Sequence, residues 1–465
     1  MMLIDPSAVC TVDVTDFFKQ DEIIYGEKMI MERINKTGRF GIVLTLSAAL
    51  LAGSVSVWGC SGQSDSGDPE TTGTTTAEVT TTAQTASVTT SSSETSAAVT
   101  ESTGTSESTE TAAADSSDGK TDRLIAEKLS DMSIEEKLAQ MFAVMPEAIS
   151  DASPVTDGYE LKDGLYEYPL GGILLMGQNI VSEDQTRSLI RDIQSYSEDR
   201  IGVPLFTFVD EEGGPVRRVS GRIDGIPYLK SAQEMTEDGD DIYTVGKTVG
   251  AYLSDMGFNV DFAPVADVVS ESSAGVINGR SFSSDPQVVA KAVTDFAKGL
   301  ESEKVYGTFK HFPGHGPTRS DTHNGSAYVD KTIDELESWD LVPFQAAIDS
   351  GAKFIMISHH TVNSIDPEGT PATLSKAVIT DLLKNKMGYD GIVVTDALNM
   401  GAITDHYSSA EAALMAVKAG ADIILEPSDF TSAYDAVLNA VESGEISEAR
   451  IDESVGKILE LKSSF

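Results

Sequence analysis

A chain of 465 residues is long enough for one large domain with additional segments, or for two domains. Its 33 lysines and arginines stand against 74 aspartates and glutamates, which leaves a formal net charge of -41. Because little positive charge is present to neutralise phosphates, nucleic acids and anionic membrane surfaces are not expected as partners.

Residues 31–60 have the order of features of a secretory signal. Three basic residues precede an apolar run at 42–58, and Cys60 follows two residues later. This order resembles a bacterial lipoprotein signal, in which the cysteine becomes the lipidated first residue of the mature chain. Trp58 departs from the small-residue pattern of such signals, which leaves an uncleaved membrane anchor as the alternative. The apolar run is near the short end of the ~17–25 residues that span a bilayer, so cleavage and a lipid anchor at Cys60 are predicted.

Residues 1–30 precede this signal and contain acidic side chains that signals rarely begin with. We therefore expect translation to start at Met29 or Met31 and exclude residues 1–30 from the fold prediction. The only other cysteine, Cys10, lies in that excluded part. The mature protein is then expected to carry no disulfide.

Residues 61–120 consist almost entirely of Thr, Ser, Ala, Gly and Glu and contain no aromatic side chain. Such a segment cannot bury enough apolar surface to offset the entropy lost on ordering. It is predicted to be a disordered tether that holds a domain at 121–465 outside the cytoplasm, away from the cell membrane. Tracts of this composition are sometimes glycosylated stalks, and the sequence leaves that open.

Three segments of the predicted domain carry the pattern that begins a helix. A serine followed three residues later by glutamate or glutamine can form a capping box, and proline is favoured in the first turn. The predicted starts are Ser133 with Glu136, Ser182 with Gln185, and Asp285 with Pro286. After the third start, the apolar residues at 289, 293, 296 and 300 share one helix face.

Between the helices lie eight apolar runs of the kind that form buried parallel strands. They cover residues 141–145, 172–176, 205–209, 259–264, 305–309, 354–357, 392–395 and 423–425. Eight strands alternating with helices over roughly 340 residues predict an α/β fold, a (β/α)8 TIM-type barrel. A doubly wound open sheet is the alternative, but no G-x-G-x-x-G follows the first strand.

Polar and charged residues follow most of these runs. They are Asp210, Glu211 and Glu212 after the third run, Asp267 after the fourth, Lys310 and His311 after the fifth, His359 and His360 after the sixth, Asp396 after the seventh, and Glu426 after the eighth. A single acid in such a position is usually a cap or a solvated turn. Because barrel strands end at one mouth, their recurrence predicts a shared polar pocket.

The stretch 310–323 holds three of the six histidines, beside lysine and aspartate. Histidine changes charge near neutral pH, so this stretch predicts proton transfer or ligand binding rather than a polar surface loop. The five histidines at 311, 315, 323, 359 and 360 could ligate zinc. No H-E-x-x-H occurs, however, and Cys60 is the only mature cysteine, so proton transfer is favoured over a metal.

The motif K-H-F-P-G-H-G at 310–316 followed by D-T-H at 321–323 resembles the signature of glycoside hydrolase family 3, in its β-N-acetylglucosaminidase branch. Supporting blocks occur in the family's order: G-G-I-L-L-M-G-Q-N-I (171–180), F-V-D-E-E-G-G (208–214), F-A-P-V-A-D-V (262–268), G-R-S-F (279–282) and V-V-T-D-A-L-N-M (393–400). The resemblance covers nearly all of 121–465 and implies a single barrel domain.

The resemblance implies a role for each matching residue. Asp396 would be the nucleophile that forms a covalent glycosyl-enzyme, and His323 paired with Asp321 would be the general acid/base. Sugar hydroxyls would be bound by Asp210, Arg218, Arg280, Lys310 and His311. No metal or other cofactor is implied, the partner is an oligosaccharide or muropeptide substrate, and a monomer is expected.

The chain departs from the family's usual sequence at Glu211 and Pro215, where Gln and Arg are common, and at T-D-A-L around Asp396 in place of S-D-D-L. These departures place fine substrate preference in doubt rather than the reaction. His359 and His360 are assigned to the pocket wall or the core.

The leading hypothesis is a retaining exo-acting β-N-acetylglucosaminidase that acts on peptidoglycan fragments or chitin-type oligosaccharides. One alternative is a β-N-acetylglucosaminide phosphorylase, because a neutral histidine repels phosphate less than a carboxylate does. Others are a broader β-glucosidase and an inactive, tethered glycan-binding lipoprotein.

Overall fold

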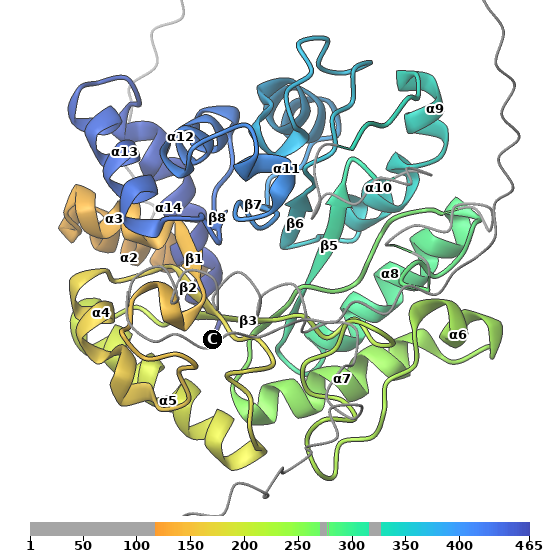
Figure 1. Cartoon of the computed structure of the whole chain (residues 1–465), viewed down its shortest axis with the longest axis horizontal. Coiled ribbons are helices and arrows are strands. Elements are labelled where there is room, and N and C mark those ends of the chain that lie inside the picture. Colours follow the sequence, from red (N-terminus) through yellow and green to blue (C-terminus); the bar gives the residue numbers. More distant parts are fainter. Residues whose placement is uncertain (1–116, 270–276, 278, 316–326) are drawn as a thin grey trace, which may run out of the picture. The chain divides into compact units, whose positions relative to one another are not determined.

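Eight parallel strands form the centre of the domain, and helices surround them (Figure 1). The computed structural model describes residues 117–269, 277, 279–315 and 327–465. The chain divides into two units, Met1–Thr105 and Ser106–Phe465, and the fold is that of the second. The strands are β1 (Phe142–Val144), β2 (Gly172–Leu174), β3 (Phe206–Val209), β4 (Val260–Asp261), β5 (Tyr306–Phe312), β6 (Phe354–Ile357), β7 (Ile392–Thr395) and β8 (Ile424–Leu425).

The strands close into a barrel. From β1 to β7 each strand pairs in parallel with the next, and β8 pairs with β1. Val394 of β7 forms a parallel bridge with Ile423 next to β8, which completes the circle. The predicted (β/α)8 barrel is confirmed, and the open-sheet alternative is excluded.

All eight predicted strands are present. Strands β6 and β7 have the predicted bounds, and the other six differ from them, with β4 shortened most and β5 the one that is extended. Strand β4 keeps only Val260 and Asp261 of the predicted run. Strand β5 begins one residue later than predicted and continues through Lys310 and His311 to Phe312. Lys310 and His311 therefore lie within the strand rather than after it. Charged partners from other strand ends permit their burial, and the local sequence does not show those partners.

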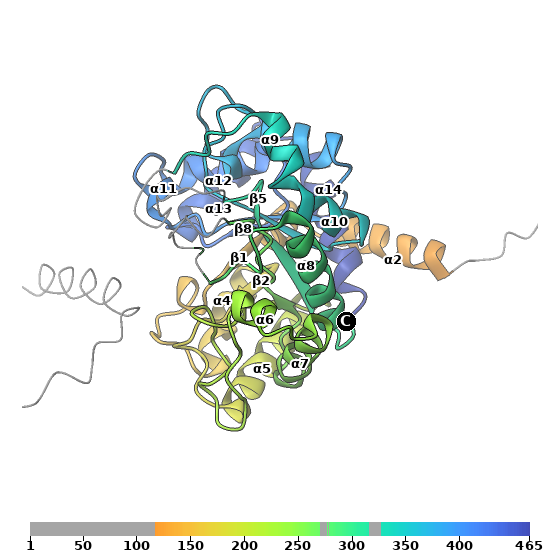
Figure 2. The ribbon, with the colours of Figure 1, turned by 90° about the vertical axis from the view of Figure 1, so that its right-hand side faces the viewer.

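The helices alternate with the strands along the chain. Their bounds are α2 (Ser117–Asp131), α3 (Ile134–Gln140), α4 (Lys162–Glu167), α5 (Glu183–Ile201), α6 (Ala232–Glu237), α7 (Ile242–Met256), α8 (Pro286–Glu301), α9 (Ile333–Ser338), α10 (Leu341–Asp349), α11 (Gly401–Thr404), α12 (Ser409–Ala419), α13 (Phe430–Glu442) and α14 (Glu448–Lys462). Short 3-10 turns lie at Pro146–Ala148, Gly158–Leu161 and Ala372–Leu374, and a π-helix covers Ala377–Lys386. Helix α2 and the C-terminal end lie on the same side of the barrel (Figure 2).

The three predicted helix starts are confirmed. Ser133 and Glu136 exchange both capping-box hydrogen bonds at the start of α3. The Ser182 side chain accepts the N–H of Gln185 at the start of α5. Asp285 caps α8 ahead of its proline.

The predicted apolar stripe of α8 is buried, and the helix lies close against α7. Glycines permit this approach: a Cβ atom at Gly246 would lie 2.2 Å from the carbonyl oxygen of Phe296. A Cβ at Gly299 would lie 2.4 Å from the carbonyl oxygen of Tyr243. Larger side chains at either position would force the two helices apart.

Aromatic rings pack together in the barrel, and two of them, Phe206 and Phe354, are the first residues of β3 and β6. Phe208 stacks on Phe262 with ring centroids 4.7 Å apart, and Phe206 meets Phe354 edge-on at 5.3 Å. Burial of each such ring stabilises the fold by roughly 1.5–3 kcal/mol. Lys462 of α14 is buried beside Phe206 at the start of β3, and its Nζ donates to Oε1 of Gln140 at 2.7 Å.

Within the described ranges, no helix is both long and apolar enough to cross a membrane.

Candidate active site

The ends of β3 and β5 carry a network of buried charges. Lys310 Nζ lies 2.9 Å from Oδ1 of Asp210 and 2.6 Å from Oε1 of Glu212. Arg280 reaches the same glutamate with two hydrogen bonds of 2.7 Å, in the bidentate geometry that suits a guanidinium. Arg218 approaches Asp210 with an N–O distance of 3.6 Å. Four of the predicted sugar-binding residues thus meet around Glu212 and Asp210.

The network determines the charge of its members. Burial alone would raise the pKa of Glu212, but Arg280 and Lys310 outweigh it and hold that pKa well below its usual range. Burial would lower the pKa of Lys310, but Asp210 and Glu212 raise it above the ordinary value. Glu212 and Lys310 are therefore charged at neutral pH and are held in place before any substrate arrives.

His311 joins this network from the other side. Its Nδ1 donates to Oδ2 of the fully buried Asp267 at 2.7 Å, and its Nε2 lies 3.5 Å from a nitrogen of Arg280. The other oxygen of Asp267 accepts the backbone N–H of His315 at 2.7 Å. Burial would raise the pKa of Asp267, but His311 lowers it, so an ionised carboxylate fixes the orientation of the imidazole ring.

Asp396 directly follows β7 and is half-buried. Its Oδ1 accepts the N–H of Ala397 at 2.8 Å, and Nε2 of His359 donates to the carbonyl oxygen of the same alanine at 2.8 Å. Burial would raise the pKa of Asp396, but His359 and His311 outweigh it and lower that pKa. The carboxylate is therefore ionised at neutral pH, as a nucleophile toward a cationic centre must be.

Glu426 follows β8 as a second, different carboxyl group. It has a left-handed backbone with φ of 48°, its Oε1 accepts the N–H of Met145, and Asn399 donates to its Oε2 at 3.4 Å. Burial raises the pKa of Glu426 to about 8. At pH 7 this side chain is mostly neutral, whereas Asp396 is ionised.

Residues 133–461 match the family described as Glycosyl hydrolase family 3 N terminal domain. The chain belongs to glycosyl hydrolase family 3.

Several relatives of this chain are named as hexosaminidases. A 338-residue match to Beta-hexosaminidase A of Pseudoalteromonas piscicida is 32% identical and covers 66% of this chain but only 55% of that protein. Beta-hexosaminidase of Nitrosomonas eutropha is 33% identical, with 62% of this chain and 83% of that protein covered.

A solved family 3 β-N-acetylglucosaminidase from Paenibacillus sp. str. FPU-7 is 35% identical and superimposes with a TM-score of 0.66. That match covers 71% of this chain and 62% of the other. The solved LpqI of M tuberculosis is 30% identical with a TM-score of 0.63, and 73% of this chain and 96% of that one are covered.

The remaining predicted functional residues lie outside the described ranges. These are Asp321 and His323, the proposed acid/base pair, and Cys60, the proposed lipidation site. The described chain stops at His315 and resumes at Ala327, so the fold shows the two ends of the segment that carries the pair. Among the described residues no group of three or more His, Cys, Asp or Glu side chains could hold a metal ion.

Glu211, one of the departures from the usual family 3 sequence, is completely buried beneath the site. Its carboxylate accepts three backbone N–H groups, from Arg218 (2.7 Å), Val219 (2.9 Å) and Ser220 (2.7 Å), and the hydroxyl of Tyr252 (2.9 Å). The carboxylate thereby fixes the backbone of the loop that presents Arg218. This supporting role was not predicted, because residue type does not show which backbone groups a buried acid meets.

Glu212 and Asp267 were recognised in the sequence only as strand-end acids, without a role. Glu212 bridges Lys310 and Arg280, and Asp267 orients His311. The predicted wall residues His359 and His360 are both buried, and the His360 ring lies edge-on to His315 at 4.1 Å.

Proposed function

We propose that this family 3 enzyme is a retaining, exo-acting β-N-acetylglucosaminidase that removes terminal β-linked GlcNAc from oligosaccharides. The observation that carries the proposal is the ionised Asp396 at the end of β7, in the field of His311, His359 and Lys310. A carboxylate in this setting can stabilise and then capture an oxocarbenium-like centre. The relatives named as hexosaminidases and the solved β-N-acetylglucosaminidase support the choice of sugar.

In the first step, an oxygen of Asp396 forms a bond to the anomeric carbon while the bond from that carbon to the leaving oxygen breaks. His323, oriented by Asp321, gives its proton to the leaving oxygen. In the second step the same histidine takes a proton from water, the water oxygen attacks the anomeric carbon, and the aspartate is released. Two inversions return the original β-configuration.

The charged network would hold the sugar during both steps. Asp210 offers carboxylate oxygens to sugar hydroxyls, while Lys310, Arg218 and Arg280 donate N–H groups. His311, whose Nδ1 is held by Asp267, leaves Nε2 for a hydrogen bond to a sugar hydroxyl. Because the ion pairs fix these groups in advance, little reorganisation is needed when substrate binds.

The test is the purified enzyme with aryl β-GlcNAc, aryl β-glucoside and a slow fluorinated GlcNAc donor. We expect release of GlcNAc and covalent labelling that Asp396→Ala abolishes. Equal or faster turnover of the glucoside would refute the sugar specificity. Formation of GlcNAc 1-phosphate on addition of inorganic phosphate would show a phosphorylase instead.

We further propose that the mature chain is a monomeric lipoprotein anchored through Cys60 outside the cytoplasm. The support is the order of basic start, apolar run and cysteine, followed by the Ser/Thr-rich segment 61–120. In cells, Cys60→Ser should abolish incorporation of labelled fatty acid and the membrane-bound form of the protein. Light scattering on the domain 121–465 tests the monomer, and a stable dimer would contradict it.

A further inference from the structure

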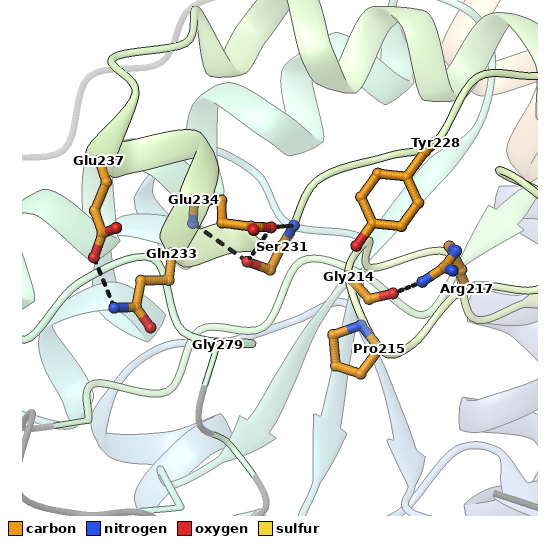
Figure 3. A pocket seen from close by; sticks show the side chains of 9 residues that line it. All are labelled: Gly214, Pro215, Arg217, Tyr228, Ser231, Gln233, Glu234, Glu237 and Gly279. Carbon is orange, nitrogen blue, oxygen red and sulfur yellow. Dashed lines mark hydrogen bonds between the residues drawn. The ribbon is translucent and has the colours of Figure 1, made fainter. Parts of the chain in front are cut away.

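A cavity of about 510 Å³ lies beside the charged network, on the loop that follows β3 and on α6 (Figure 3). Its volume is within the usual range of small-molecule sites. Gly214 in its lining is two residues after Glu212, and Gly279 directly precedes Arg280. The cavity and the proposed sugar site therefore share two stretches of backbone.

One side of the cavity offers ring faces. Pro215 is exposed, and Tyr228 is 55% exposed although it is aromatic. The Arg217 guanidinium lies 4.4 Å from the centroid of the tyrosine ring, which holds that ring in place. Figure 3 shows Tyr228, Pro215 and Arg217 grouped on this side. Apolar ring faces of this kind suit the C–H face of a sugar.

The opposite side offers polar groups from α6 and its cap. Gln233 donates to Glu237 at 2.7 Å, and Glu234 accepts the N–H and hydroxyl of Ser231. An amide and carboxylates held in this way can bind sugar hydroxyls. A pyranose has an apolar C–H face and polar hydroxyl groups. Ring faces on one side of the cavity and hydrogen-bond acceptors on the other therefore suit it.

The charges of the lining select between two kinds of sugar. Glu234 and Glu237 place two carboxylates on the cavity, against the single guanidinium of Arg217. That guanidinium already donates to the carbonyl oxygens of Gly214 and Ser220 and lies over Tyr228. A ligand that carries a carboxylate would meet net repulsion, whereas a neutral sugar would not.

Building on the proposed hydrolase function, we propose that this cavity binds a neutral hexosamine of the leaving group, as in chitin-type oligosaccharides, in preference to a muramic acid with its lactyl carboxylate. The rings of Tyr228 and Pro215 contact the sugar, and the carboxylates of Glu234 and Glu237 repel the lactyl carboxylate of muramic acid. Substrate preference is thus set outside the network that surrounds the reacting bond.

The experiment compares GlcNAc β-fluoride, whose leaving group is a single atom, with β-1,4-linked GlcNAc di- and trisaccharides. Tyr228→Ala should lower kcat/KM for the oligosaccharides about tenfold, mainly through KM, and leave the fluoride unchanged. Tyr243→Ala, an exposed tyrosine on α7 outside the lining, is the matched control. Failure to hydrolyse the fluoride would refute the hydrolase itself. Hydrolysis with an unaltered oligosaccharide kcat/KM in Tyr228→Ala would refute only the cavity's role.

A second arm uses the disaccharide GlcNAc-β-1,4-MurNAc. The enzyme should prefer the GlcNAc disaccharide, and Glu237→Gln should narrow that preference about threefold by removing one negative charge. Glu442→Gln, an exposed acid in the last turn of α13, is the control. A native preference for the muramyl disaccharide would overturn the proposed selectivity.

Discussion

The two ends of the barrel each bury a lysine, and the two lysines are in opposite electrostatic situations. At the mouth, Lys310 is 3% exposed and meets the carboxylates of Asp210 and Glu212, which raise its pKa. At the other end, Lys462 is 2% exposed and donates to the neutral amide of Gln140, and burial lowers its pKa well below the usual value.

The difference shows that partners, not burial, decide whether a buried amine is charged. A charged lysine between two carboxylates offers both donors and acceptors, which suits a ligand with hydroxyl groups. A lysine among phenylalanine rings, with its Nζ 5.0 Å from the centroid of Phe206, mainly fills space. The mouth is therefore the proposed site of the chemistry, and the closed end contributes to stability.

The largest effect is expected at the mouth from Asp396→Asn. The substitution keeps the size of the side chain but removes the proposed nucleophile, so kcat on aryl β-GlcNAc should fall by about 10⁴-fold or more. Asp405→Asn, an exposed acid at the end of α11, should retain full activity. Substantial activity in Asp396→Asn, with no covalent intermediate by mass spectrometry, would mean that another group attacks the sugar.

Lys310→Met should damage both function and stability. It leaves Asp210 and Glu212 buried with reduced compensation, and breaking such a pair costs about 3–5 kcal/mol. Urea unfolding measures this loss, and kcat/KM should fall at the same time. The double variant Lys310→Met with Glu212→Gln should recover part of the stability but not the activity. If Lys310→Met unfolds with the same free energy as the native chain, the ion pairs of Lys310 with Asp210 and Glu212 contribute little to stability.

A further contrast at the mouth concerns the neutral Glu426. Its pKa is raised to about 8, so the unfolded chain loses this proton before the folded chain does. The stability from the neutral carboxyl is therefore complete below about pH 4 and is lost as the pH rises through 8. Glu426→Gln keeps an acceptor for Met145 and does not titrate. Its advantage in unfolding free energy over the native chain should grow by about 3–5 kcal/mol between pH 4 and 8. An advantage that does not change with pH would contradict the raised pKa.

Much of this arrangement could be predicted from the sequence because each barrel strand is buried on both faces. Every strand residue except Tyr306 is buried, so the strands appear as continuous apolar runs. Strand β5 was underestimated because Lys310 and His311 resemble the end of a run. Their partners, Glu212 and Asp267, lie far away along the chain, and no local pattern indicates such pairs.

The sequence was least informative for residues whose role depends on contacts that form only in the folded chain. Glu211 supports the loop of Arg218 through backbone hydrogen bonds that residue type alone cannot indicate. Lys462 lies in the last turn of α14, where a lysine is ordinarily solvated and favoured by the helix dipole. Its burial follows from how α14 packs beneath the barrel, which only the assembled fold shows.

The smallest effect is expected at the closed end from Lys462→Met. A lysine whose folded-state pKa is depressed contributes stability above about pH 10.4 and loses it as the pH falls through the folded value. At pH 7 methionine removes that cost and also the hydrogen bond to Gln140, and because these contributions have opposite signs the variant should lose little or no stability. Raising the pH from 7 to 10 should favour the native chain over the variant. Lys376→Met, at an exposed site, should show no such trend. A loss of about 3–5 kcal/mol, the value expected for Lys310→Met, would mean that Lys462 is charged and that the two ends of the barrel do not differ in this respect.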